Sequence, residues 1–287
     1  MSTKNWDLII ESDSKKSQFS FSEIARYKDL LFLFVKRDFI SLYKQTVLGP
    51  LWVVIQPILT TITFFIVFTK IAEIGTGGVP PSLFYMLGVT TWTYFGDCVT
   101  KTSDTFILNQ NIFSKVYFPR LIVPLSLVVT NLIKFGIQFV LFLAFLFYYI
   151  IFETDPNATW GFSWQLILIP WLIFIMATLG LGVGLVISAL TTKYRDLRFL
   201  IQFGVQLVMY GTPVVWPMKN IASEHHWKLF LNPMSSVLET FKVAFFGVDF
   251  AVFNWFALLY SSVFALLILF FGVRLFSRIE KSFMDTI

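Results

Sequence analysis

The chain has 287 residues, of which 56% are hydrophobic and 14% are charged, and its mean hydropathy is +0.74. So little polar surface excludes a soluble globular protein of this size. The net charge of +5 does not indicate nucleic-acid binding, because no basic cluster interleaved with aromatic residues lies away from the hydrophobic stretches. Cys98 is the only cysteine, which excludes an intrachain disulfide and argues against a cysteine-based metal site.

Six hydrophobic stretches predict membrane-spanning helices, because each is near or above the roughly 20 residues that cross about 30 Å of hydrocarbon. They are Leu51–Thr69, Leu83–Val99, Leu121–Phe152, Leu166–Leu190, Leu197–Val215 and Ala251–Val273. The sequence therefore predicts an all-α membrane protein with three parts. These are a cytoplasmic N-terminal segment (1–50), a transmembrane domain (51–273) and a cytoplasmic tail (274–287).

The positive residues predict the orientation of these spans. If both termini are cytoplasmic, 17 of the 22 Lys and Arg residues lie inside. Lys70, Lys219, Lys228 and Lys242 then lie outside, and Lys134 lies within the third span. Positive residues near span ends are retained on the cytoplasmic side, so this orientation is favoured over its inverse.

Before the first span, Asp29–Gln45 has its polar residues on one side of a helical wheel and apolar residues around the rest. This pattern predicts an amphipathic helix in the cytoplasmic membrane interface. Its Lys36, Arg37 and Lys44 would face lipid headgroups or a cytosolic partner. The alternative is an anchor that only fixes the first span.

Two short segments connect spans on the cytoplasmic side. Asn109–Arg120 is polar and aromatic and ends near Pro119, which predicts a short helix parallel to the membrane. Thr191–Arg198 is a charged turn. Its Arg195 and Asp196 can pair with each other or with a partner, or can simply be solvated.

Within the spans, Lys134 is the one full charge far from an end, so it either snorkels or faces a polar cavity. The run from Gly180 to Gly184, followed by Ser188, places small residues at four-residue spacing. This pattern lets two helices approach closely. The close partner could be another span of the same chain or a second protomer.

Residues 212–250 form an unusual external connection. Pro213, Pro217 and Pro233 interrupt the segment, which is otherwise rich in apolar and aromatic residues. It is too broken for one span and too apolar for a solvated loop. We therefore expect two short helices that re-enter the outer leaflet before the last span.

The sequence has no phosphate-binding Walker motif, since Gly75–Gly78 lacks the required lysine. The spans also lack the carboxylate and histidine relays of proton-driven carriers, because Asp97 and Lys134 are nearly their only ionisable residues. The chain is therefore expected to have no catalytic activity of its own and to depend on an outside source of energy, or to need none.

Five motifs occur along the chain in the order expected for one family. They are Arg37–Trp52 with Gln56-Pro57, Tyr117–Pro124, Tyr194–Arg198, Pro213–Pro217 and Asn232–Met234. Together they resemble the permease subunit of ABC-2-type exporters, and more narrowly the subunit that exports O-antigen and related surface polysaccharides. The resemblance covers almost the whole chain.

The resemblance implies a multi-pass subunit of the bacterial cytoplasmic (inner) membrane that dimerises with a second copy and pairs with two separate ATPase subunits. It implies lipid-linked polysaccharide as cargo. ATP and Mg²⁺ would bind the partner subunit, with no cofactor bound by this chain. The interfacial helix and the 109–120 segment would contact the ATPase. The candidate coupling residues are Lys36, Arg37, Asn109, Phe113, Tyr117, Phe118, Arg195 and Asp196.

Aromatic residues make up 19% of the chain, and sugar rings stack on such side chains with little dependence on linkage. The candidate channel residues are Trp52, Tyr85, Trp92, Tyr94, Lys134, Tyr210 and Trp216. The alternative is that these Trp and Tyr residues only mark the bilayer interfaces.

Other functions stay open from the sequence. Permeases for teichoic acid or another lipid-linked cargo share these motifs. A membrane-embedded glycosyl- or acyltransferase would need a carboxylate or histidine cluster at a membrane face, and the sequence shows none. A passive channel or scaffold is the third alternative.

Overall fold

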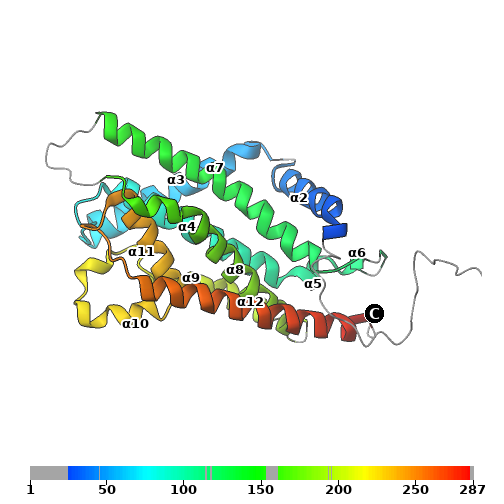
Figure 1. The fold of residues 1–287 in the computed structure, drawn as a ribbon. Coiled ribbons are helices and arrows are strands. Elements are labelled where there is room, and N and C mark those ends of the chain that lie inside the picture. Colours follow the sequence, from blue (N-terminus) through cyan, green and yellow to red (C-terminus); the bar gives the residue numbers. More distant parts are fainter. Residues whose placement is uncertain are drawn as a thin grey trace, which may run out of the picture.

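The computed structural model describes residues 25–44, 46–113, 115–116, 118–152, 161–192, 194 and 196–284. Over these residues the chain is helical, without β-strands. Its longer helices form an elongated bundle (Figure 1). In chain order they are α2 (Lys28–Tyr43), α3 (Trp52–Phe64), α4 (Pro81–Ser103), α7 (Ile122–Phe152), α8 (Ile169–Thr191), α9 (Leu197–Gly211), α11 (Pro233–Phe246) and α12 (Trp255–Met284).

Short helices and helical turns lie between the longer helices. A 3₁₀ turn (Gly49–Leu51) precedes α3, and a π-helical stretch (Phe65–Ile71) continues it. Helices α5 (Thr105–Leu108) and α6 (Gln110–Phe113) follow α4. The remaining pieces are the 3₁₀ turns Trp164–Leu168, Met218–Asn220 and Ser223–His225, and helix α10 (His226–Phe230).

Four stretches of the described chain are long and apolar enough to cross a membrane. They are Gly49–Ile71, Ile122–Phe152, Trp164–Thr191 and Trp255–Glu280. They coincide with the first, third, fourth and sixth spans expected from hydropathy, which confirms these as long apolar helices. A polytopic membrane protein follows, because only helices and closed barrels satisfy their backbone groups inside lipid.

The second and fifth expected spans differ from these four. Helix α4 has 23 residues, so its length of about 34 Å is sufficient, but its second half carries Asp97 and Lys101. Helix α9 has only 15 residues, about 22 Å. It ends at Gly211 and not at Val215, because Thr212 is extended and Pro213 follows. That α4 and α9 also span the membrane stays a prediction.

The bundle has two distinct ends (Figure 1). Helices α2, α5 and α6 and the last turns of α12 lie at one end, which we call the α2 end. Helices α10 and α11 lie at the other, which we call the α11 end. At the α2 end, the Arg120 Nη1 atom donates to the carbonyl of Glu280 at 3.1 Å, which ties the start of α7 to α12. The N-terminal helix, the 109–120 segment and the last turns of α12 therefore share one end, as the expected orientation requires.

Helix α8 crosses the two helices beside it at very short range. A Cβ atom on Gly184 would lie 2.5 Å from the Thr102 Cβ of α4. A Cβ atom on Gly182 would lie 2.7 Å from the Leu269 backbone nitrogen of α12. The small residues of α8 therefore serve packing within the chain, which answers the question that the sequence left open.

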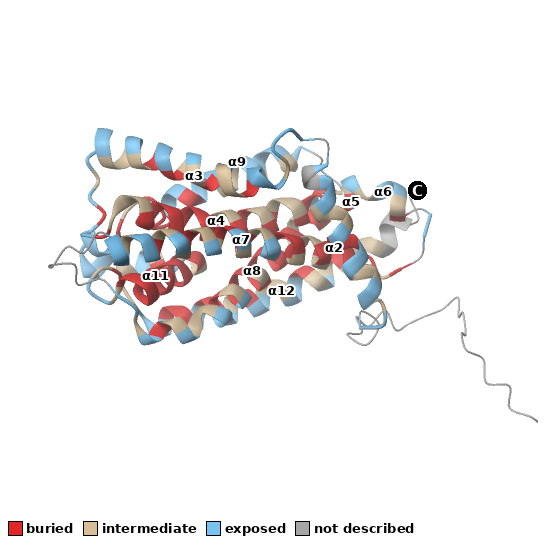
Figure 2. Cartoon of the chain, turned by 90° about the horizontal axis from the view of Figure 1, so that it is seen from above, coloured by how far each residue is buried: buried red, intermediate tan, exposed pale blue. Residues whose placement is uncertain are grey.

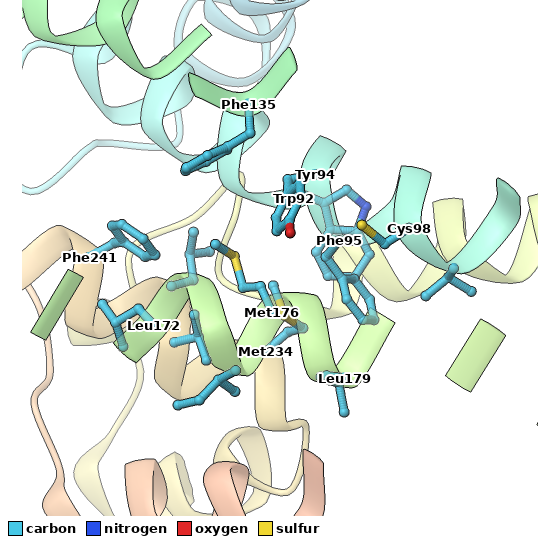
Figure 3. Packing of buried hydrophobic residues seen from close by; sticks show 14 of the residues in the cluster. Trp92, Tyr94, Phe95, Cys98, Phe135, Leu172, Met176, Leu179, Met234 and Phe241 are labelled. Atoms are coloured by element: carbon cyan, nitrogen blue, oxygen red, sulfur yellow. The ribbon is translucent and has the colours of Figure 1, made fainter. Parts of the chain in front are cut away.

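Burial is concentrated between α4, α8 and α11 (Figure 2). Helix α11 is buried along its length from Met234 to Phe246. Figure 3 shows Phe241 and Met234 of this helix facing Leu172 and Met176 of α8. The 215–246 segment therefore does not lie wholly in solvent, since Val215, Met218 and α11 are buried, whereas most of the residues between Lys219 and Leu231 are exposed. The first of the two expected re-entrant helices is reduced to short turns and the five-residue α10, and insertion of either piece into a leaflet stays a prediction.

Candidate functional site

Lys134 forms an ion pair with Asp97, and its side chain is 14% exposed. Its Nζ atom lies 2.8 Å from the Asp97 Oδ2 atom. Lys101 lies one turn farther along α4, with its Nζ atom 3.7 Å from the same oxygen and donating to the Asn131 Oδ1 atom at 2.7 Å. The sequence identified Asp97 and Lys134 separately, and the structure brings them together. Because Nζ is held by Asp97, Lys134 does not snorkel freely.

The candidate channel residues divide into two groups. Tyr85, Trp92 and Tyr94 are at most 5% exposed and belong to the packing of α4. The Tyr85 hydroxyl lies 3.0 Å from the Thr69 hydroxyl, and the Tyr94 ring packs on Phe135 with centroids 5.2 Å apart. Figure 3 shows Trp92 and Tyr94 inside this packed region. A sugar could reach these three side chains only if the helices around α4 moved.

The other candidate aromatics are accessible. Trp52 is 45% exposed and Tyr210 is 44% exposed. The half-buried Trp216 donates from its Nε1 atom to the Tyr210 carbonyl at 3.1 Å. The Tyr210 ring lies 6.5 Å from the Phe68 ring. Tyr210 and Trp216 therefore sit together where α9 ends, beside the first span.

A second ion pair lies in α11 and was not recognised from the sequence. Glu239 and Lys242 are each 1% exposed, with the Lys242 Nζ atom 2.9 Å from Glu239 Oε1. This Nζ also donates to the Pro213 carbonyl and lies 4.3 Å from the centre of the Phe84 ring. Lys242, which the charge count placed in an outside segment, is therefore buried within the chain. The sequence did contain a sign of this pair, because Glu239 and Lys242 are opposite charges three residues apart within an apolar run.

The second carboxylate oxygen of Glu239 completes this arrangement. Glu239 Oε2 accepts a hydrogen bond from the Val252 backbone nitrogen at 2.9 Å. The pair thus fastens two irregular segments to α11, one before it at Pro213 and one after it at Val252. Buried charges persist when they are paired and hydrogen-bonded in this way.

At the α2 end, Phe113 and Phe118 are 4% and 5% exposed. Their rings belong to an aromatic cluster that joins α2, α5, α6 and α12. Consecutive ring centroids in it lie 4.5–6.0 Å apart, along Phe276, Phe106, Phe113, Phe118 and Phe34. These two candidates therefore hold the 109–120 segment on the chain instead of presenting themselves as anchors. Tyr117 lies outside the described residues.

The remaining coupling candidates are at the surface or close to it. Lys36 is exposed, and the Arg37 Nη2 atom pairs with Asp38 Oδ1 at 2.7 Å while its guanidinium covers Phe34 at 4.6 Å. Asn109 is half-buried, and its Nδ2 atom donates to the Thr105 carbonyl at 3.0 Å. Asp196 is exposed at the start of α9, and Arg195 lies outside the described residues.

A buried carboxyl links α4 to α9 at the α2 end. Asp104 Oδ2 lies 2.9 Å from the Arg198 Nε atom, and the Asp104 side chain is 8% exposed. Burial raises the pKa of Asp104 above its ordinary value, and Arg198 only partly opposes this shift. The fold therefore favours the protonated form of Asp104. The contribution of this group to the free energy of unfolding is complete below its pKa in the unfolded chain, and it is lost as pH rises through its raised pKa in the folded chain.

We expect Asp104→Asn to be at least as stable as the wild type at pH 7.5, because it removes the cost of the buried charge. Arg198→Met should destabilise the chain by about 1 kcal/mol, since the arginine is partly exposed. The measurement is the thermal unfolding midpoint in detergent at pH 5 and pH 7.5. An Asn variant clearly less stable at pH 7.5 would show that the Arg198 pair outweighs desolvation.

Known proteins resemble the chain over most of its length. The family described as ABC-2 type transporter matches residues 29–246. Two relatives, both named O-antigen export system permease protein RfbA, come from Klebsiella pneumoniae and Myxococcus xanthus, and each is 27% identical to the chain. The first match covers 90% of this chain and 94% of the relative. The second covers 78% and 83%.

Proposed function

Because the chain belongs to the ABC-2 type transporter family, a family of transport subunits, we propose that it is the membrane subunit of an exporter for lipid-linked polysaccharide of the O-antigen type. The observation that carries this proposal is the match to O-antigen export permeases over about nine-tenths of the chain. The subunit resides in the bacterial inner membrane. A second copy completes the channel, and a separate ATPase supplies the energy.

The geometry of the α2 end supports a docking role for the 109–120 segment. Its aromatic cluster joins α5 and α6 to α2 and α12, so a push on this segment would reach both of these longer helices. Exposed residues in this segment and directly before it are available for contact, with Val116 59% and Leu108 64% exposed. We propose that the ATPase binds this surface, together with Lys36 of α2 and Asp196, which directly precedes α9.

The α11 end supports a role in closing the conduit. Tyr210 and Trp216 are accessible there, and sugar rings stack on such side chains. The Glu239–Lys242 pair holds the broken segment around Pro213 against α11. We propose that the 212–246 segment is the outer gate, which parts when the ATPases bind nucleotide.

The docking proposal predicts that Leu108→Asp with Val116→Asp will strongly reduce co-purification of an ATPase subunit with the tagged chain. The reason is that charge replaces exposed apolar contacts while the fold is unaffected. By contrast, Phe113→Ala removes a buried ring and should cost about 3–5 kcal/mol of stability.

The measurement pairs affinity purification from membranes with the thermal midpoint of each variant. Full recovery of the ATPase with the Leu108 and Val116 double variant would remove this surface from the coupling site. Absence of any stoichiometric ATPase with the wild type would contradict the proposed function itself.

A further inference from the structure

The cluster around Asp97 carries more positive than negative charge. It contains two ammonium groups, those of Lys101 and Lys134, and the single carboxylate of Asp97. The uncharged side chain of Asn131 accepts a hydrogen bond from Lys101. With both lysines protonated, one positive charge is in excess. A structural ion pair between α4 and α7 would need only one of the two lysines.

The cluster is open on one side. The exposed fractions are 30% for the Lys101 side chain, 26% for Asp97 and 14% for Lys134. On α4, the half-buried residues Thr93, Asp97, Thr100 and Lys101 follow the three- and four-residue spacing of one helix face. The open side is therefore polar over about two turns.

The position of the cluster along α7 explains this opening. The Val53 carbonyl, at the start of α3, accepts a hydrogen bond from the Gln138 Nε2 atom at 3.1 Å. Lys134 lies one turn before Gln138 on α7, so the first span begins just beyond the cluster. Figure 1 shows α2 and α3 following one another along α7. In the proposed orientation the cluster then faces the cytoplasmic half of the membrane.

An excess positive charge that is partly exposed near the start of the first span attracts an anion. A phosphate suits this position, because Lys binds phosphate as a compact point charge through charge-assisted hydrogen bonds. The ammonium groups have three N–H donors each, and Asp97 and Asn131 do not use all of them.

We propose that Lys101 and Lys134 bind the phosphate group of a lipid-anchored anion through the N–H donors that Asp97 and Asn131 do not occupy. The phosphate can belong to a lipid-linked cargo or to a bilayer phospholipid. Its assignment to the cargo rests on the proposed function, whereas the binding site itself does not.

The test uses the full-length chain in phosphatidylcholine nanodiscs, to which a polyprenyl phosphate or phosphatidylglycerol is added. Native mass spectrometry measures the bound fraction. Lys101→Met and Lys134→Met should each weaken binding about tenfold or more, as loss of a hydrogen bond to a charged group does. Lys134→Arg should keep most of it. Lys228→Met, at an exposed lysine of the α11 end, is the control and should leave binding unchanged.

Asp97→Asn should change the affinity for the phosphate lipid in the opposite direction, which separates phosphate binding from a purely structural role. It raises the net charge of the cluster by one, so it should tighten phosphate binding. If it weakens binding as much as Lys134→Met does, or if neither lysine variant changes binding of either lipid, the cluster is only a structural ion pair. Thermal midpoints identify any variant that fails to fold.

The two lipids distinguish the source of the phosphate. A loss confined to the polyprenyl phosphate assigns the site to cargo, whereas an equal loss for phosphatidylglycerol assigns it to phosphate headgroups in general. Both results support the site. Because the assay contains no ATPase, a negative result leaves the exporter assignment standing, and loss of ATPase association would leave the phosphate site standing.

Discussion

Lys242→Met is expected to destabilise the folded chain by about 3–5 kcal/mol, because it leaves Glu239 as a buried charge without its partner. The carboxylate would keep only the hydrogen bond from the Val252 nitrogen, and the Pro213 carbonyl would lose its donor. The measurement is the thermal or denaturant midpoint of the purified chain in detergent.

The matched double variant Glu239→Gln with Lys242→Met should be clearly more stable than the single one, since no charge is then left buried. Lys228→Met should be neutral, because Lys228 is exposed. If Lys242→Met melted like the wild type, the pair would not fasten the α11 end, and the outer-gate proposal would lose its structural basis.

Gly182→Leu is expected to cost about 3 kcal/mol or more, because the added side chain meets backbone that cannot yield. Its Cβ atom would lie 2.7 Å from the Leu269 nitrogen and 2.9 Å from the Ile268 carbonyl carbon. Helix α8 would have to move away from α12 over the whole contact. The measurement is again the midpoint of unfolding.

Gly136→Leu is the matched control, since it is a glycine of the spanning helix α7 with no atom within 4 Å of an added Cβ. It should be tolerated and should gain some helix propensity. Equal losses for the two substitutions would mean that the cost is general to large residues in these spans and not due to the α8–α12 crossing.

The long spans could be predicted because lipid imposes a simple rule on sequence. Hydropathy placed the start of α7 within one residue, at Leu121 against Ile122, and its end at Phe152. The same rule placed the end of the fifth span too late, at Val215 and not at Gly211. Residues Thr212–Val215 are as apolar as a lipid-facing helix, but they pack inside the chain as an irregular segment. Apolar composition does not distinguish burial in lipid from burial in protein.

The interior contacts could not be predicted because they depend on which helices meet. Phe113 and Phe118 suit a docking surface as well as a core, and only the neighbourhood of Phe106 and Phe276 decides that they are buried. Glu239 and Lys242 likewise resemble ordinary external charges until Pro213 and Val252 come into contact with them. The small residues of α8 are an intermediate case, since their spacing predicted close packing but not the partner.

ATP-driven transport in a defined system tests the exporter proposal most directly. Proteoliposomes would contain this chain, the ATPase subunit recovered with it and a fluorescently labelled lipid-linked polysaccharide. The account predicts that the label crosses the bilayer only when both proteins and hydrolysable ATP are present, and that it stops when the chain is omitted. Transport without the ATPase, or none from a complex that hydrolyses ATP and binds the cargo, would contradict it.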